Sequence, residues 1–210
     1  GLFEARKLNS PLKSLFVVEG YMDVIALHQN GVTNAVASLG TAITGLHISK
    51  MMRYCKNIYV AFDGDLAGRK AAWRAVENGL PILREDINIS FIFLEEGHDP
   101  DSYINEHGKE AFLELANAAT SLSKFFIETV KEQADLITIE GRSLAAKFAV
   151  PLVNKINNQP LKEAYIEEVG KVCSLDFANL INTTSNQYTS SPLNKSEEIK
   201  PKSSSKIARK

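Results

Sequence analysis

The sequence has few cysteines and no long apolar run, and each shortage excludes a class of protein. Only two of its 210 residues are cysteines, Cys55 and Cys173. Neither has a partner at CxxC spacing, which excludes a zinc ribbon and a disulfide framework. We expect two buried free thiols in a reducing compartment. No apolar run approaches membrane-spanning length and no signal peptide is present, so we expect no contact with a membrane.

Positive charge is also scarce over most of the chain. The formal net charge is −1 at pH 7. Residues 185–210 hold six basic and two acidic side chains, which gives this tail +4 and leaves −5 for the remaining residues. A body with this charge would be unusual for a protein that relies on it alone to hold nucleic acid.

An alternation of apolar runs and helical patterns fills the first half of the chain. Continuous apolar runs, typical of strands covered on both faces, occupy residues 15–18, 35–38, 58–62 and 89–94. Helical spacing follows the first three runs, over residues 22–29, about 46–55 and about 66–77. This alternation predicts an α/β fold with a parallel sheet and right-handed crossovers.

From residue 102 onward the pattern is helical. Helices are expected around residues 102–106, 109–116, 122–133, 139–156 and 161–173. We expect Thr138 to cap the fourth of these, Pro151 to kink or split it, and Asp176 to cap a last short helix. From residue 183 Ser, Asn, Lys and Pro dominate, which predicts a flexible linker or tail.

Three acidic clusters follow strands of the predicted sheet. They are Glu19 with Asp23, Asp63-Gly64-Asp65, and Asp99-Pro100-Asp101. Because the carboxyl ends of parallel strands meet at one edge, where such sheets bind ligands, we expect the clusters to converge. Six converging carboxylates repel one another unless divalent cations lie between them, and carboxylate oxygens suit Mg²⁺. The clusters therefore indicate metal-dependent phosphoryl chemistry.

Each cluster also has a purely structural explanation. The first fits acids that favour a helix N-terminus. The second fits an Asx-turn with a helix cap, which accounts for one aspartate better than for two, so we favour a metal site there. The third fits a capping aspartate before a proline in the first helical turn, the better explanation of that cluster taken alone. The third cluster is assigned to a metal site only because the other two acidic clusters are expected at the same edge.

Side chains outside these clusters give weaker signals. Five basic residues flank the helices near the acidic edge: Lys50, Arg53, Arg69, Lys70 and Arg74. We select Arg69 as a phosphate ligand and assign most of the others to solvated helix faces. Backbone approach to a nucleotide is expected at Gly20, Gly64 and Gly68. The four histidines, His28, His47, His98 and His107, show no ligand spacing to one another, and Trp73 is expected in the core.

Four segments in succession resemble the Toprim core of DnaG-type bacterial primases. They are Val18–Val24, Ala37–Thr41, Phe62–Arg69 and Gly97–Asp101. The motifs are highly specific in combination, and the resemblance covers about residues 1–180. Type IA topoisomerases share the Toprim fold, but Met22-Asp23 and Ala67-Gly68 are primase-like where topoisomerase motifs differ.

The resemblance implies a Toprim-like parallel sheet flanked by helices, then a C-terminal helical bundle and a flexible tail. Residues 1–14 would end a preceding polymerase subdomain, 15–101 would form the Toprim domain, 102–182 the bundle and 183–210 the tail. Family primases also carry an N-terminal zinc-binding domain and a basic polymerase subdomain. Neither is found in this sequence, so zinc is not expected here. The first residue is Gly rather than Met, and we expect a piece of a longer protein.

The implied activity is metal-dependent nucleotidyl transfer, which synthesises RNA primers on single-stranded DNA during replication. Glu19, Asp63 and Asp65 match the catalytic acids of the family. The implied metal ligands are Glu19, Asp23, Asp63, Asp65, Asp99 and Asp101. Mg²⁺ or Mn²⁺ is the implied cofactor. Whether Glu19 acts as a general base or as a further ligand stays open.

The resemblance also implies partners and a location. The partners are nucleoside triphosphates, a single-stranded DNA template and the replicative helicase, the last through a C-terminal domain outside this chain. We expect a monomer in the bacterial cytoplasm, at the replication fork as part of a primosome. Two alternatives stay open. In the first, the isolated piece, which we expect to be inactive or weakly active, is a non-catalytic metal- and nucleotide-binding module or a docking scaffold. In the second, the chain is a nuclease of the Toprim class.

Overall fold

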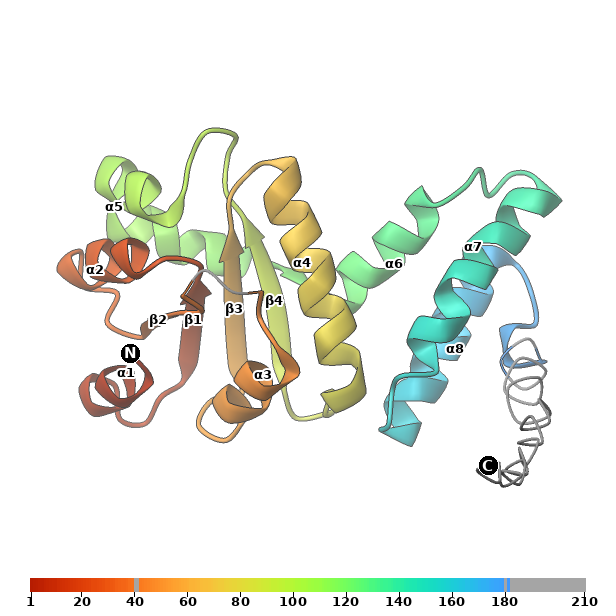
Figure 1. Cartoon of the computed structure of the whole chain (residues 1–210), viewed down its shortest axis with the longest axis horizontal. Coiled ribbons are helices and arrows are strands. Elements are labelled where there is room, and N and C mark those ends of the chain that lie inside the picture. The colour runs from red at the N-terminus through yellow and green to blue at the C-terminus, as the bar shows by residue number, and fades with distance from the viewer. Residues whose placement is uncertain (40–41, 180, 182–210) are drawn as a thin grey trace, which may run out of the picture.

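The computed structural model describes residues 1–39, 42–179 and 181. Gly40 and Thr41, the end of the Ala37–Thr41 segment, and the predicted tail from residue 183 lie outside the described residues. Within these ranges a sheet with helices on both faces is followed by a further group of helices, as Figure 1 shows. No helix in the described part of the chain is long and apolar enough to cross a membrane.

The sheet has five strands in the order β2-β1-β3-β4-β5. Their bounds are β1 Ser14–Val18, β2 Ala35–Ala37, β3 Asn57–Phe62, β4 Asn88–Phe93 and β5 Thr120–Ser121. The first four strands are mutually parallel, which confirms the predicted topology. The two-residue β5 pairs antiparallel with β4 and was not predicted, because two residues are too few to show a strand pattern.

Helices cover both faces of the sheet, as the continuous apolar strands require. One face is covered by α2 (Tyr21–Gln29) and α5 (Pro100–Asn117), and the other by α3 (Gly45–Met52), α4 (Leu66–Gly79) and α6 (Leu122–Glu132). Alternate residues of β1 serve the two cores: Phe16 and Val18 face α2 and α5, whereas Leu15 and Val17 face α3 and α4. The short α1 (Leu2–Leu8), which was not predicted, lies beside β2.

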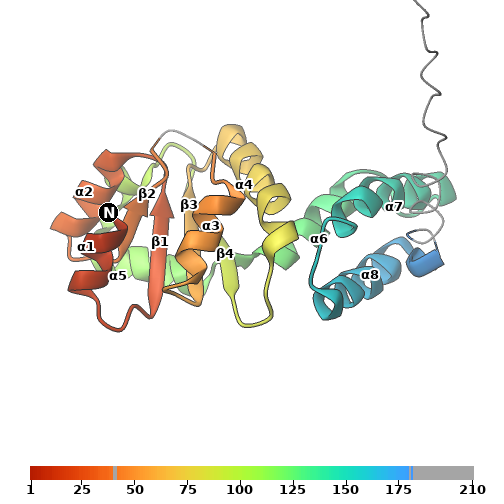
Figure 2. The same cartoon turned by 60° about the horizontal axis from the view of Figure 1, so that its bottom comes forward.

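The remaining helices pack beyond α4. A 3₁₀ turn, η1 (Leu80–Ile82), follows α4, and α7 (Ile139–Val153) and α8 (Gln159–Cys173) lie side by side next to α6 (Figure 2). Phe126 is fully buried where these elements meet, with its ring centroid 6.3 Å from Trp73 and 5.3 Å from Tyr165. The core of the helical group is therefore continuous with one face of the sheet.

Three helix details bear on the sequence predictions. Thr138 caps α7 as predicted, because its side-chain oxygen accepts a hydrogen bond from the Gly141 N–H. Pro151 neither splits nor ends that helix, which continues through it to Val153. The two helices predicted over 102–106 and 109–116 are confirmed, because α5 consists of two helical segments that meet at Gly108, whose φ of 82° is not helical. Helix α5 packs against α2 and the sheet.

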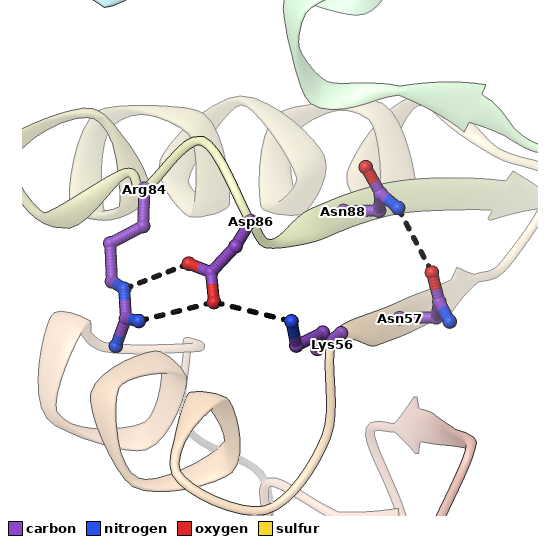
Figure 3. A network of polar contacts seen from close by, with 5 residues as sticks. All are labelled: Lys56, Asn57, Arg84, Asp86 and Asn88. Atoms are coloured by element: carbon purple, nitrogen blue, oxygen red, sulfur yellow. Dashed lines mark hydrogen bonds and ion pairs between the residues drawn. The ribbon is translucent and has the colours of Figure 1, made fainter.

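The amino ends of β3 and β4 are joined by paired polar groups (Figure 3). Asp86 accepts from Arg84 at 3.0 Å and lies 3.7 Å from the Lys56 ammonium group. Asn88 Nδ2 donates to Asn57 Oδ1 at 3.0 Å. In this network two basic side chains, Arg84 and Lys56, flank the carboxylate of Asp86, whereas the opposite edge of the sheet carries the acidic clusters.

Candidate metal centre

The parallel strands deliver the acidic clusters to one edge. Glu19 directly follows β1 and Asp63 directly follows β3. Strand β4 ends level with β3, because Phe93 pairs with Phe62, and its outgoing loop leads to Asp99. The carboxyl edge of the sheet therefore carries one member of each cluster.

Asp23 connects the first cluster to the third. It is the one buried charged side chain among the described residues, with 9% of its surface exposed. Its Oδ2 accepts a hydrogen bond from the Gly20 N–H at 2.9 Å, and the backbone of Asp101 also bonds to this carboxylate. Burial raises the pKa of Asp23, and the nearby charges of Asp99 and Asp101 add to the increase.

Asp63 lies among the other acids. Burial raises its pKa from 3.8 to about 6, and four neighbouring carboxylates add to the increase. Those neighbours are Glu19, Asp23, Asp99 and Asp65. An acid from every cluster therefore lies close enough to Asp63 to disfavour its ionised form. The three clusters thus meet at one edge of the sheet, as the order of the strands predicted.

Asp65 and Asp99 each cap the N-terminus of a helix, as the structural explanation of their clusters predicts. Asp65 caps α4 by accepting from the Gly68 N–H at 2.8 Å, and Asp99 caps α5 by accepting from the Ser102 N–H at 2.7 Å. The bonds from Ser102 lower the pKa of Asp99. Each cap uses the Oδ1 oxygen. Helix capping therefore fixes both carboxylates at the edge and is compatible with a role in binding.

Two of the glycines that follow Asp63 are required by close backbone packing. A Cβ atom at Gly64 would collide with the carbonyl oxygens of Leu94 and Glu95, and one at Gly68 would collide with the carbonyl oxygen of Asp63. These contacts hold the acidic turn against the end of β4. The nucleotide contacts predicted for Gly20, Gly64 and Gly68 stay predictions.

The carboxylates stand apart from one another. In residues 1–39, 42–179 and 181, no three of them bring oxygen atoms within 4.8 Å of one another. The one trio of potential metal-binding side chains that meets this distance in those ranges is His98, Glu106 and His107. The sequence shows no ligand spacing between His98 and His107, and the fold brings these two residues together in space.

Two arginines of α4 differ from the sequence expectation. Arg69 lies 3.5 Å from Glu132 and over the Phe93 ring, so its predicted phosphate contact stays a prediction. Arg74, assigned from sequence to a solvated face, lines a cavity of about 160 Å³ together with Glu19 and Ser38. Ala71 lines the same cavity one turn earlier, so this side of α4 faces the cavity. No local sequence pattern identifies Arg74, because the position of α4 over the sheet decides what it lines.

Comparison with known proteins gives two family matches and many relatives. Residues 16–104 match the Toprim-like family, and residues 123–177 match a family described as the DnaB-helicase binding domain of primase. The DNA primase of Pseudomonas aeruginosa is 43% identical over 181 residues, which is 86% of this chain and 27% of that protein.

Solved structures agree with these matches. A DNA primase domain from Pseudomonas aeruginosa superimposes with a TM-score of 0.82 at 42% identity, covering 86% of this chain and 58% of that one. A DnaG primase catalytic domain bound to single-stranded DNA gives a TM-score of 0.75 at 41% identity, covering 81% and 55%.

The sheet order and the acidic edge, with these matches, define a Toprim-like α/β domain followed by helices. The chain belongs to the DnaG-type DNA primase family and corresponds to part of its catalytic core. It spans about a quarter of the length of the curated Pseudomonas relative. The helicase-binding family match falls within the chain, on α6 to α8, whereas the sequence prediction placed the helicase contact outside it.

Proposed function

We propose that this chain supplies the metal-binding half of a primase active site, in which RNA primers are synthesised on a single-stranded DNA template. The observation that carries the proposal is the position of Asp63, whose pKa is raised by the charges of nearby acids from all three clusters. Parallel strands place these clusters at the edge where α/β sheets bind ligands. The related catalytic domains support the same activity.

The residues at this edge fit a hard divalent cation. Every donor group is a carboxylate, which Mg²⁺ and Mn²⁺ prefer: Glu19, Asp23, Asp63, Asp65, Asp99 and Asp101. A cation bound there neutralises charge on a triphosphate and lowers the pKa of an attacking hydroxyl group. Asp63 and Asp65 are the central ligands, and Glu19 serves as a ligand or as the general base.

The other residues of the site position these acids. Asp23 holds the N-terminus of α5 through the Asp101 backbone and so orients the third cluster. The Gly64 contact with the end of β4 fixes the turn that bears Asp63. Arg74, in the cavity beside Glu19, is the basic group that we propose for phosphate contact in addition to Arg69.

The partners are proposed on the same grounds. Nucleoside triphosphates bind at the acidic edge, and the template lies on a basic part of the whole protein, because residues 1–184 of this chain carry a net charge of −5. Helices α6 to α8 contact the replicative helicase, as the family description for residues 123–177 suggests. We also propose the division into segments 1–14, 15–101, 102–182 and 183–210, a monomeric state and a cytoplasmic location.

A second function applies to the isolated chain, which covers little more than half of the related catalytic-core structures. Without the remaining part we propose a metal-binding module that does not synthesise primers. A template-directed assay on this chain and on the whole protein separates the two functions. Primer synthesis by the isolated chain would refute the second proposal, whereas full activity of whole proteins carrying Glu19→Gln or Asp63→Asn would refute the first.

A further inference from the structure

A trio of potential metal ligands lies beside the acidic edge, and none of its members belongs to the site proposed above. Ligand atoms of His98, Glu106 and His107 all lie within 4.8 Å of one another. His98 Nε2 is 3.9 Å from Glu106 Oε2, and the two imidazole rings have centroids 5.4 Å apart.

The local fold explains why these residues meet. His98 precedes the residue that caps α5, while Glu106 and His107 end the first half of that helix, where Gly108 breaks it. Tyr103 is buried between them, with its ring 4.5 Å from the His107 ring and 5.8 Å from the His98 ring. Packing on one aromatic side chain limits where both imidazoles can point.

The orientation of the His98 ring is also defined by a hydrogen bond. Its Nδ1 atom lies 3.3 Å from Ser102 Oγ, and its Nε2 atom faces Glu106. Metal-binding histidines commonly use one ring nitrogen for the metal and bond the other to a polar neighbour, which fixes the ring and its tautomer. Ser102 is such a neighbour here.

We propose that His98, Glu106 and His107 form a binding site for a divalent transition metal of the Zn²⁺ class. Two imidazoles and one carboxylate form a known type of three-ligand zinc set, and such ligands suit Zn²⁺, Co²⁺ and Ni²⁺ better than Mg²⁺. Bonds of about 2.0–2.1 Å to a tetrahedral ion require ligand atoms about 3.3 Å apart. The His98–Glu106 pair, at 3.9 Å, needs only a small side-chain adjustment to reach that spacing.

The bound ion would connect the loop after β4 to the middle of α5. Because His98 is adjacent to Asp99, the site would restrain the helix N-terminus from which the third acidic cluster projects. The chain would then sort cations by donor chemistry, with oxygen-preferring ions at the sheet edge and imidazole-preferring ions at the trio.

Co²⁺ absorption in excess Mg²⁺ tests this site on the 210-residue chain. We expect a visible band from Co²⁺ held by imidazole ligands, and competition of that band by Zn²⁺. His107→Gln and Glu106→Gln should each weaken Co²⁺ binding by at least about tenfold. The matched controls are His47→Gln and Glu110→Gln, exposed positions outside the trio that should leave binding unchanged.

A further variant separates this site from the acidic edge. Asp63→Asn should leave the Co²⁺ band intact while it removes stabilisation by Mn²⁺. The proposal is overturned if no band forms, if the band survives both His107→Gln and Glu106→Gln, or if Asp63→Asn abolishes it. Both trio substitutions are at exposed positions, so thermal melts of the metal-free variants are expected to match the wild type and to verify folding.

Discussion

Asn in place of Asp63 is expected to stabilise the metal-free chain at neutral pH, although it removes a proposed metal ligand. The pKa of Asp63 rises from 3.8 to about 6, so ionising this carboxyl group costs more in the folded state than in the unfolded state. A shift of about 2 units corresponds to about 3 kcal/mol. The side chain is only half-buried and screened by solvent, which reduces the expected gain to about 1–2 kcal/mol.

The pH dependence of this gain has a defined sign. Between pH 3.8 and about 6 the folded state binds more protons at Asp63 than the unfolded state does, so wild-type stability falls as the pH rises through that window. The Asn variant has no proton to lose there. The stability difference between variant and wild type should be small at pH 4 and should approach its full value as the pH rises beyond about 6.

Urea unfolding in EDTA at several pH values from 4 to 8 measures this difference. Asp135→Asn is the matched control, because its side chain is exposed and its bond from the Ile137 N–H can be kept by an amide oxygen. Added Mn²⁺ should reverse the order and make the wild type the more stable protein. The reasoning is refuted if the Asp63→Asn protein in EDTA is less stable than the wild type at pH 8, or if the difference does not change with pH.

Three further outcomes are expected. Millimolar Mn²⁺ should raise the melting temperature of the wild-type chain, and EDTA should reverse this effect. The expected gain in unfolding free energy is about 2.7 kcal/mol when the free ion is at 100 times its dissociation constant. An unchanged melting temperature would count against the metal site. Gly64→Ala should lower stability by about 1–3 kcal/mol in chemical denaturation, because its Cβ meets backbone carbonyls. Phe126→Ala should lower the free energy of unfolding by about 3–5 kcal/mol, because this ring is fully buried. Arg69→Ala should lower it by less than about 1 kcal/mol, because the ion pair with Glu132 is exposed. Similar losses for the two variants would contradict the packing described.

The strands and the acidic edge could be predicted because they depend on local patterns and one topological rule. Apolar runs marked β1, β3 and β4, and parallel pairing then required their following acids to meet at one edge. In contrast, α1 and β5 escaped prediction. The first has one buried residue, Ala5, in seven, and the second has only two residues.

The histidine trio could not be predicted from spacing. It depends on the path of the loop before α5 and on the helix break at Gly108, neither of which sequence periodicity specifies. Arg74 was missed for a related reason: charge suggested a solvated face, while the position of α4 over the sheet edge decides what it lines. Residues that act through tertiary placement therefore required the structure.

Primer synthesis by the whole protein tests the central claim most directly. The wild type would be compared with Asp63→Asn and with Asp135→Asn as the control, across a range of Mg²⁺ and Mn²⁺ concentrations. If the acidic edge binds the catalytic cations, Asp63→Asn should lower the rate by at least about 100-fold, a loss of roughly 2.7 kcal/mol of transition-state stabilisation, with Asp135→Asn unaffected. Wild-type rates from Asp63→Asn at every metal concentration would contradict the claim.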